Sequence, residues 1–164
     1  MIAIAPSTAE AVRYAGGWLF DQVLAGWDVT VVTAEAGDPR PLDILGVRAR
    51  DFDAVFAFPV LGPCLQAIVL RADLYRDDER VRRLVLAAAE SGRAEIRLWG
   101  EAWPPDFDGS GDPVSHRLSL AARAFKAQAL AAAGLRDAPP AETEVFRRGE
   151  LRRPRLAAVS LQNV

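Results

Sequence analysis

Polar side chains follow the apolar runs of this sequence where predicted strands end. Arg71 and Asp73 come directly after the apolar run 65–70, and Glu101 follows the run 94–99. A carboxylate can serve as a general acid or base, and an arginine can hold an anion. The carboxyl ends of parallel strands meet at one edge, where open α/β sheets bind ligands. The predicted ligand-binding residues are Ser7, Thr8, Thr33, Glu35, Arg71, Asp73, Trp99 and Glu101.

Asp73 and Glu101 are the candidates for acid–base catalysis, and His116 is the third candidate. His116 is the only imidazole and Cys64 the only thiol of the chain. Nothing in their spacing brings the two together as a nucleophile and its base, and the apolar neighbours of Cys64 favour a buried structural cysteine. One histidine with scattered carboxylates does not predict a metal site, and no cofactor is predicted.

Two ligand motifs are present only in part. Residues 106–112 resemble the opening of an EF-hand calcium loop, with acids at loop positions 1 and 3 and glycine at position 6, but position 12 falls on Arg117. An acidic loop that ends in a helix cap is therefore the preferred interpretation. Glu35 follows the second predicted strand, where an acid can bind a ribose hydroxyl. Since neither GxxxxGK[ST] nor GxGxxG occurs, a solvated loop is the preferred interpretation of Glu35.

The elements that position these residues follow from hydrophobic periodicity. The predicted strands are residues 2–5, 28–33, 65–70, 94–99 and 142–146, and the main predicted helices are residues 8–25, 77–91 and 113–133. Short helices are expected at 41–45 and around 51–57. Strands that alternate with helices indicate an α/β fold. We predict a single-domain three-layer α/β sandwich of Rossmann-like or flavodoxin-like architecture, with a mostly parallel sheet of four or five strands, over residues 1–146.

The first helix carries more apolar surface than one face of a sheet can cover. Tyr14, Trp18 and Phe20 lie off its main apolar stripe and need cover from another segment or another subunit, which suggests a homodimer with these residues at its interface. Gly16 and Gly17 each cost about 1 kcal/mol relative to alanine inside a helix. Their presence predicts a close approach of the helix backbone to the sheet or to another helix.

The amino-acid composition limits the cellular location and the binding partners that the protein is expected to have. The 164 residues carry a formal net charge of −2, and a single cysteine excludes an internal disulfide. No run reaches the roughly 20 apolar residues of a membrane span, so a cytoplasmic location without membrane contact is predicted. The tail 147–164 opens with five arginines and one glutamate between Arg147 and Arg155. It is either a solvated terminus or a contact for an acidic protein, and without aromatic interleaving nucleic acid is not an expected partner.

Two functions from different classes fit these features. The preferred prediction is a non-catalytic binding or regulatory module that acts through protein–protein contacts, because no nucleophile–base pair, metal cluster or phosphate loop is visible in the sequence. The alternative is a small enzyme that acts on an anionic or nucleotide-like ligand at the carboxyl edge of the sheet. In that enzyme Asp73 or Glu101 is the acid–base group and Arg71 holds the anion.

Overall fold

The structure, a computed structural model, describes residues 1–57, 65–108 and 111–152. The strands of this part of the chain are β1 (Ile2–Ala5), β2 (Thr30–Thr33), β3 (Arg48–Asp51), β4 (Ala67–Arg71), β5 (Glu95–Trp99), β6 (Pro113–Arg117) and β7 (Thr143–Gly149). The helices are α1 (Thr8–Leu24), α2 (Arg40–Ile44), α3 (Phe52–Phe56), α4 (Ala72–Asp77), α5 (Glu79–Glu90) and α6 (Leu120–Ala132).

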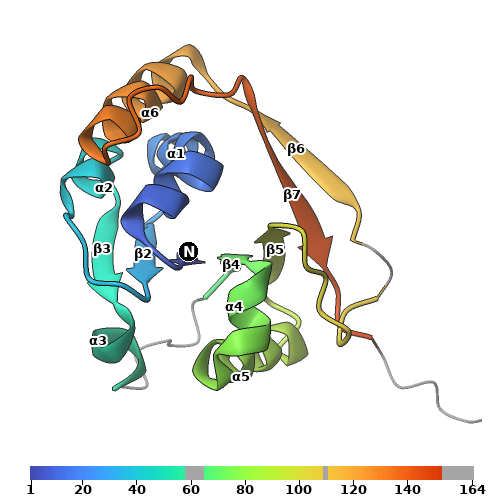
Figure 1. The fold of residues 1–164 in the computed structure, drawn as a ribbon. Helices are drawn as coiled ribbons and strands as arrows, with labels where there is room; N and C mark the ends of the chain where they lie inside the picture. Colours follow the sequence, from blue (N-terminus) through green and yellow to red (C-terminus); the bar gives the residue numbers. More distant parts are fainter. Residues whose placement is uncertain (58–64, 109–110, 153–164) are drawn as a thin grey trace, which may run out of the picture.

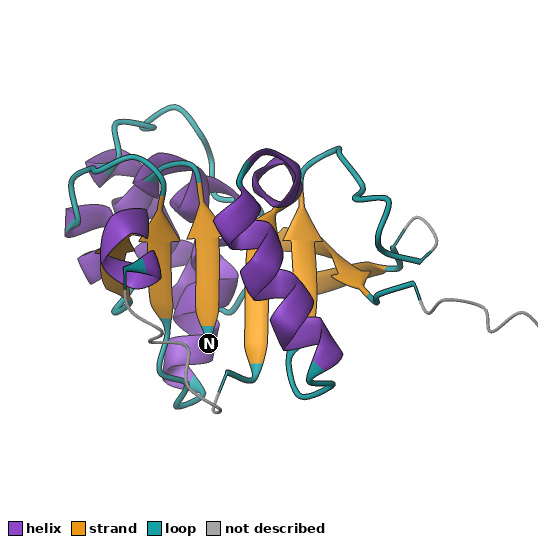
Figure 2. Cartoon of the chain, turned by 90° about the horizontal axis from the view of Figure 1, so that it is seen from below, coloured by secondary structure: helices purple, strands orange, loops and turns teal. Residues whose placement is uncertain are grey.

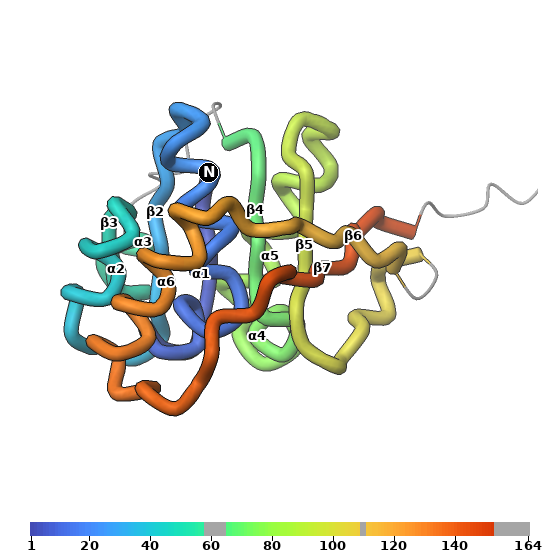
Figure 3. Tube along the Cα trace, turned by 90° about the horizontal axis from the view of Figure 1, so that it is seen from above, coloured from blue at the N-terminus to red at the C-terminus, as the bar shows by residue number. Residues whose placement is uncertain are grey.

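All seven strands form one sheet, in the order β3-β2-β1-β4-β5-β7-β6. The first five strands of this order are parallel to one another, and Figure 2 shows such parallel strands side by side. β7 is antiparallel to both β5 and β6, and Figure 3 shows β6 and β7 extending together to one side of the molecule. The predicted parallel sheet is confirmed, but it is larger than the four or five strands expected.

Helices cover both faces of the sheet. α1, α2 and α6 pack on the face that carries Ala3, Ala5 and Val31, and α3, α4 and α5 pack on the face of Ile2 and Ile4. Figure 1 shows α1 and α6 above the sheet and α4 and α5 below it. Successive residues of β1 point to opposite faces, and all four are buried, as expected for a central parallel strand. The three-layer α/β architecture is therefore confirmed.

The largest error in the predicted elements lies at residues 113–117. Asp112 followed by Pro113 fits a helix cap and first helical residue, so the last helix was expected to begin there. These residues instead form β6, whose side chains alternate between exposed and half-buried, and α6 begins after Ser119, whose hydroxyl accepts a hydrogen bond from Ala122 N (3.0 Å). β3, which precedes the expected short helix α3, is the other added strand.

α1 lies within the helix predicted at residues 8–25, and both of its ends have residues that favour a helix end. Ser7 caps the helix, because its Oγ accepts a hydrogen bond from Glu10 N (3.3 Å). Gly26 follows the helix at a φ of +90°, a left-handed conformation that glycine adopts without steric cost. The second half of a capping box is not formed, because the Glu10 carboxylate binds Arg71 instead of the Ser7 amide.

The middle of α1 is joined to β7 and α6 by a buried ion pair. Glu144 of β7 accepts hydrogen bonds from Gly17 N (2.9 Å) and Trp18 N (2.7 Å), and Lys126 of α6 donates to Arg13 O (2.8 Å) and to Glu144 Oε1 (2.5 Å). In a regular helix Gly17 N would donate to Arg13 O. Here Glu144 accepts the hydrogen bond from Gly17 N, and Lys126 donates to Arg13 O, so the ion pair supplies a partner for each of these two backbone groups. Gly17 also touches Leu118, where a Cβ would lie only 2.9 Å from Leu118 Cγ. The predicted close approach at the glycine pair is confirmed.

The same segments cover two aromatic side chains of α1. Trp18 is 3% exposed and packs against Phe146 of β7 (5.2 Å between ring centroids), and Phe20 is 8% exposed and stacks on Phe125 of α6 (4.6 Å). Tyr14 is 43% exposed. The cover that Trp18 and Phe20 need thus comes from the same chain, which corrects their assignment to a subunit interface.

The predicted boundary between domain and tail falls inside β7. Arg147 and Arg148 belong to this strand and pair with Leu98 and Arg97 of β5, so the sheet continues beyond residue 146. Residues 153–164 of the predicted tail, Arg155 among them, lie outside the described residues. Within the described part of the chain, no helix has both the length and the apolar character needed to cross a bilayer.

Candidate functional site

The strand order reverses between β1 and β4. β2 and β3 extend the sheet on one side of β1, and β4 and β5 extend it on the other. β1 and β4 are adjacent and parallel, with Ile4 beside Leu70, so the connections that leave them diverge to opposite faces. Such a reversal opens a crevice at the carboxyl ends of the strands, the usual ligand site of open α/β sheets.

Three charged side chains meet at this reversal point. Arg71 ends β4; its Nε donates to Asp73 Oδ2 at 3.0 Å, and its Nη1 donates to Glu10 Oε1 on the first turn of α1. The three side chains are 29–33% exposed. The hydrogen bond to Glu10 raises the pKa of Arg71, against the opposing effect of burial, so the guanidinium is permanently charged. We call Glu10, Arg71 and Asp73 the switch-point cluster.

The switch-point cluster retains unused hydrogen-bonding groups. Arg71 Nη2 bonds no group of the described residues, which leaves donors of its planar fork available. Glu10 Oε2 is buried and has no hydrogen-bond partner among the described residues. Buried polar atoms are nearly always paired with protein or water, so an unpaired carboxylate oxygen here marks a place for a polar group of a ligand or for water.

A small pocket of about 220 Å³ is lined by residues that follow β1 and β2 and by residues of α2 and α6, and no member of the switch-point cluster lines it. Ser7, Thr8, Glu35 and Gly37 contribute to its lining. Asp38, at the same pocket, is held by Arg40 through a hydrogen bond of 2.7 Å from Nε. Three of the predicted ligand-binding residues, Ser7, Thr8 and Glu35, are therefore brought together here.

The other predicted site residues divide into two kinds. Thr33 and Trp99 are buried at 6% and 3% exposure, so they belong to the core below the edge. Glu101 is exposed and makes no side-chain hydrogen bond or ion pair to the described residues. Gly100 brings the exit of β5 next to Arg71, since a Cβ there would lie 3.8 Å from Arg71 Cγ. Of the two predicted acid–base residues, only Asp73 thus bonds the arginine.

His116 lies in β6, not in the first turn of a helix, and belongs to a different cluster. Its Nε2 lies 2.8 Å from Asp21 Oδ2, and Ser119 Oγ donates to Asp21 Oδ1 at 2.6 Å. A serine nucleophile needs a hydrogen bond to its histidine base, whereas here the aspartate stands between the two. The three side chains therefore join α1, β6 and α6, and this position does not support His116 as a catalytic residue.

Replacing Asp21 with asparagine is expected to lower the free energy of unfolding at pH 7 by about 1–3 kcal/mol, because a charged acceptor of several hydrogen bonds is lost. Burial raises the pKa of Asp21, but the hydrogen bonds from Ser119 and His116 outweigh it and lower the pKa below the usual 3.8. The stabilisation is then fully present above pH 3.8 and disappears as the pH falls through the folded-state pKa. Urea denaturation of both proteins between pH 7 and pH 2.5 should show their stabilities converging.

Asp137→Asn, at an exposed carboxylate, is the matched control for this experiment. A difference in stability between the wild type and Asp21→Asn that stays constant down to pH 2.5 would contradict the stabilising role of the ionised Asp21.

The calcium-like loop is held by protein contacts at its start. Asp106 accepts hydrogen bonds from Tyr75 Oη (2.8 Å) and Arg82 Nη2 (3.1 Å), and burial together with Asp106 raises the pKa of Tyr75 to about 12. Residues 109 and 110 of the loop, and Cys64, lie outside the described residues. Across the part of the chain that is described, no group of three His, Cys, Asp or Glu side chains could hold a metal ion.

Sequence reasoning did not include Glu10 among the site residues, because Ser7 and Glu10 have the spacing of a helix capping box. The spacing gave no sign that β4 would place Arg71 within reach of the same carboxylate. The burial of Lys126, which is 1% exposed, was not predicted from the sequence either. A lysine is rarely buried unless it is paired, and its partner Glu144 lies beyond the end of the helix.

Comparisons with known proteins show the fold. A crystal structure described as a triple mutant of a deacetylase of the teicoplanin biosynthetic pathway has a TM-score of 0.67 and 18% identity, over 92% of this chain and 98% of that chain. A deacetylase–teicoplanin complex has a TM-score of 0.66 and 15% identity, over 93% and 99%. The deacetylase of the antimicrobial A40926 pseudoaglycone has a TM-score of 0.67 and 16% identity, over 93% and 98%. No protein-family model and no curated protein matches the chain.

These neighbours overturn the preferred prediction of a non-catalytic binding module. The three solved structures described above, which share the fold along almost the whole chain, are described as deacetylases, which are enzymes. Identities of 15–18% establish a common fold and leave the reaction of this chain open. The alternative prediction, a small enzyme, agrees better with these findings.

Proposed function

We propose that this protein is a small enzyme that binds an anionic or nucleotide-like ligand at the carboxyl edge of its sheet, between β1 and β4. The observation that carries the proposal is the switch-point cluster: an arginine oriented by two carboxylates at the strand-order reversal. Asp73 and Glu10 fix the guanidinium from two sides, so that its free Nη2 points its donors in a defined direction.

Each member of the cluster has a role that follows from its contacts. Arg71 donates to an anionic oxygen of the ligand through Nη2. Asp73 is the acid–base residue, since it is half-buried beside the arginine. Glu10 positions Arg71 through Oε1 and accepts a ligand hydroxyl or amide proton at its unpaired Oε2. The backbone amides at the start of α1, next to the Ser7 cap, add donors for the same anion.

Removal of an acyl group from an amide is the second candidate and the first reaction to test. It is favoured because the structures of the same fold are described as deacetylases. In this reaction water adds to the amide carbonyl, the carbon–nitrogen bond breaks, and a carboxylate and an amine are released. Asp73 would take the proton of the attacking water and pass it to the leaving nitrogen, and Arg71 would hold the carboxylate product.

Thermal unfolding in the presence of ligands tests the proposal. Inorganic phosphate, nucleotides, sugar phosphates and an N-acetylated amino sugar are added to the wild-type protein, to Arg71→Gln and to Arg93→Gln. Arg93 is exposed and precedes the amino end of β5, whereas Arg71 lies at the carboxyl end of β4, so Arg93 controls for the lost charge. A ligand at a hundredfold excess over Kd should raise Tm by about 5–10 °C in the wild type and in Arg93→Gln, and much less in Arg71→Gln.

Two outcomes would overturn the proposal. One is that none of these compounds raises Tm of the wild-type protein. The other is that Arg71→Gln responds as strongly as Arg93→Gln does. For the second candidate, release of acetate from the N-acetylated sugar is measured directly, and its loss in Asp73→Asn is the expected result.

The surroundings of the enzyme remain predictions. We propose a cytoplasmic location because the chain has a single cysteine and its described helices do not cross a membrane. The homodimer now depends on Tyr14, since Trp18 and Phe20 are buried within the chain. Light scattering at tens of micromolar distinguishes a dimer from a monomer of 17.8 kDa.

A further inference from the structure

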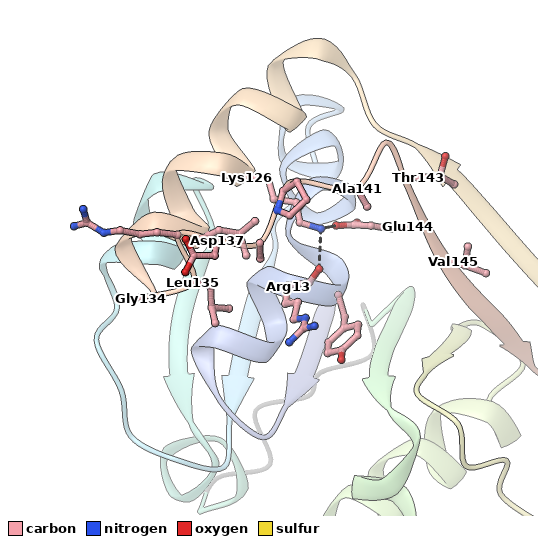
Figure 4. A pocket seen from close by; sticks show the side chains of 14 residues that line it. Arg13, Lys126, Gly134, Leu135, Asp137, Ala141, Thr143, Glu144 and Val145 are labelled. Carbon is pink, nitrogen blue, oxygen red and sulfur yellow. Dashed lines mark hydrogen bonds and ion pairs between the residues drawn. The ribbon is translucent and has the colours of Figure 1, made fainter.

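A second pocket lies away from the carboxyl edge. Its volume is about 770 Å³, and it is enclosed by α1, the C-terminal part of α6, the connection 134–141 and β7 (Figure 4). Small-molecule sites have volumes of roughly 300–1,000 Å³. The pocket shares no lining residue with the switch-point cluster, and the proposed function does not use it.

The buried ion pair forms part of its wall. The side chains of Lys126 and Glu144 are each 2% exposed, and Figure 4 shows Lys126 between Arg13 O and the Glu144 carboxylate. Burial raises the pKa of Glu144, and the Lys126 charge opposes this effect. The ammonium uses two of its three N–H donors in these bonds, and the third has no partner among the described residues. The wall is thus rigid and carries one unused donor.

The mouth of the pocket has an excess of positive charge. Arg13 and Arg136 both line it, and neither forms an ion pair with any carboxylate of the described residues. Most other arginines of this part of the chain are paired, Arg40, Arg48 and Arg80 among them. Lys126 and Glu144 neutralise each other, which leaves Arg13, Arg136 and Asp137 as the other charged lining residues, a net charge of +1.

Apolar side chains line the same pocket. Tyr14 and Val145 are 43% and 55% exposed, and both line this pocket. Leu130 and Leu135 of α6 and the following loop contribute further apolar surface. Exposed hydrophobic residues that gather in one concave site mark a binding site more often than isolated ones do.

We propose that this pocket is a second ligand site, which binds a small organic anion with an apolar body. The carboxylate of the ligand pairs with Arg13 at the mouth, and its hydrocarbon part packs against Tyr14, Leu130 and Val145. The anion supplies the carboxylate that Arg13 lacks within the chain, and the hydrocarbon covers side chains that the fold leaves exposed.

Isothermal titration of the full-length protein with octanoate tests this site. Octanol has the same apolar body without the charge, and inorganic phosphate has charge without the apolar body. We expect octanoate to bind more tightly than either compound, and Arg13→Gln to raise its Kd about tenfold by removing one charge-assisted contact. Arg93→Gln, at an exposed arginine outside the pocket, is the matched control and should leave the Kd unchanged.

The same titration separates this site from the proposed active site. Arg71→Gln should leave octanoate binding unchanged, because Arg71 is not a pocket residue. A loss of octanoate binding in Arg71→Gln, with no effect of Arg13→Gln, would move the site to the carboxyl edge and overturn the inference. Equal affinity for octanol and octanoate, or no binding of octanoate at all, would overturn it as well.

Discussion

Replacing Lys126 with methionine is expected to lower the free energy of unfolding by about 3–5 kcal/mol, the largest stability effect among the substitutions considered. Methionine fills a similar volume but removes the charge that faces Glu144 at 2.5 Å. The Glu144 carboxylate then stays 98% buried with only the amides of Gly17 and Trp18 as partners. A buried charge without its counter-ion is costly, and breaking such a pair typically costs this amount. Urea denaturation monitored by the tryptophan fluorescence of the protein measures the change.

A double substitution distinguishes the ion pair from simple packing. In Lys126→Met combined with Glu144→Gln, no buried charge remains, and the glutamine oxygen still accepts a hydrogen bond from the α1 backbone. The double variant should therefore regain at least about 1 kcal/mol relative to Lys126→Met alone. Additive destabilisation by the two substitutions would show that the pair is not coupled, contrary to its geometry.

Alanine substitutions at the two adjacent glycines of α1 are expected to differ in their effect on stability. In Gly17→Ala the new methyl group would lie 2.4 Å from Leu118 Cδ1, 2.5 Å from Cδ2 and 2.9 Å from Cγ, closer than carbon atoms tolerate, so Leu118 or the helix must move. Overpacking of this kind costs about 1–3 kcal/mol, and the gain in helix propensity of about 1 kcal/mol offsets only part of it. A net loss of about 1–2 kcal/mol is expected by urea denaturation.

Gly16→Ala is the matched control in the same helix. Its methyl group would meet Leu45 Cδ1 at 3.3 Å and Val12 Cγ1 at 3.5 Å, contacts that the ends of flexible side chains can relieve. The gain in helix propensity then remains, and the stability should stay within about 1 kcal/mol of the wild type. Equal stability of the two variants would mean that Leu118 moves aside freely and that the close approach does not require Gly17.

Four of the five parallel strands, β1, β2, β4 and β5, were predictable because their residues satisfy local rules. β2 consists of β-branched residues that are stiff and suit a pleated, buried surface. α1 begins and ends where Ser7 and Gly26 indicate, and its apolar residues repeat with helical spacing. In these segments local preference and burial agree, so the sequence alone is sufficient.

β6 and the buried lysine were not predictable because tertiary contacts override the local signals there. Pro113 after Asp112 is as acceptable at the start of an edge strand as in a first helical turn, and only pairing with β7 decides between them. Lys126 is a good helix former on either face of α6, and its burial depends on Glu144, which belongs to a different element. Neither the pairing of β6 with β7 nor the ion pair of Lys126 with Glu144 produces a recognisable periodic pattern in the sequence.

The candidate site was predictable in its place but not in its composition. Arg71 and Asp73 follow from the rule that parallel strands expose polar residues at their carboxyl ends. The third member, Glu10, was missed because the order of the strands decides which helix faces β4. Single-strand rules also placed Glu101 at the edge, where it is exposed and makes no side-chain contact with the cluster.

The bond from Glu144 to the first helix has a consequence for synthesis of the chain on the ribosome. The backbone amides of Gly17 and Trp18 donate to the carboxylate of Glu144, which lies 127 and 126 residues further along the chain. A nascent chain that ends before residue 144 contains β1, α1 and β4 but leaves these amides and the Lys126 ammonium without their carboxylate. Such long-range contacts slow folding, so the N-terminal half reaches its final packing only after nearly the whole chain has emerged.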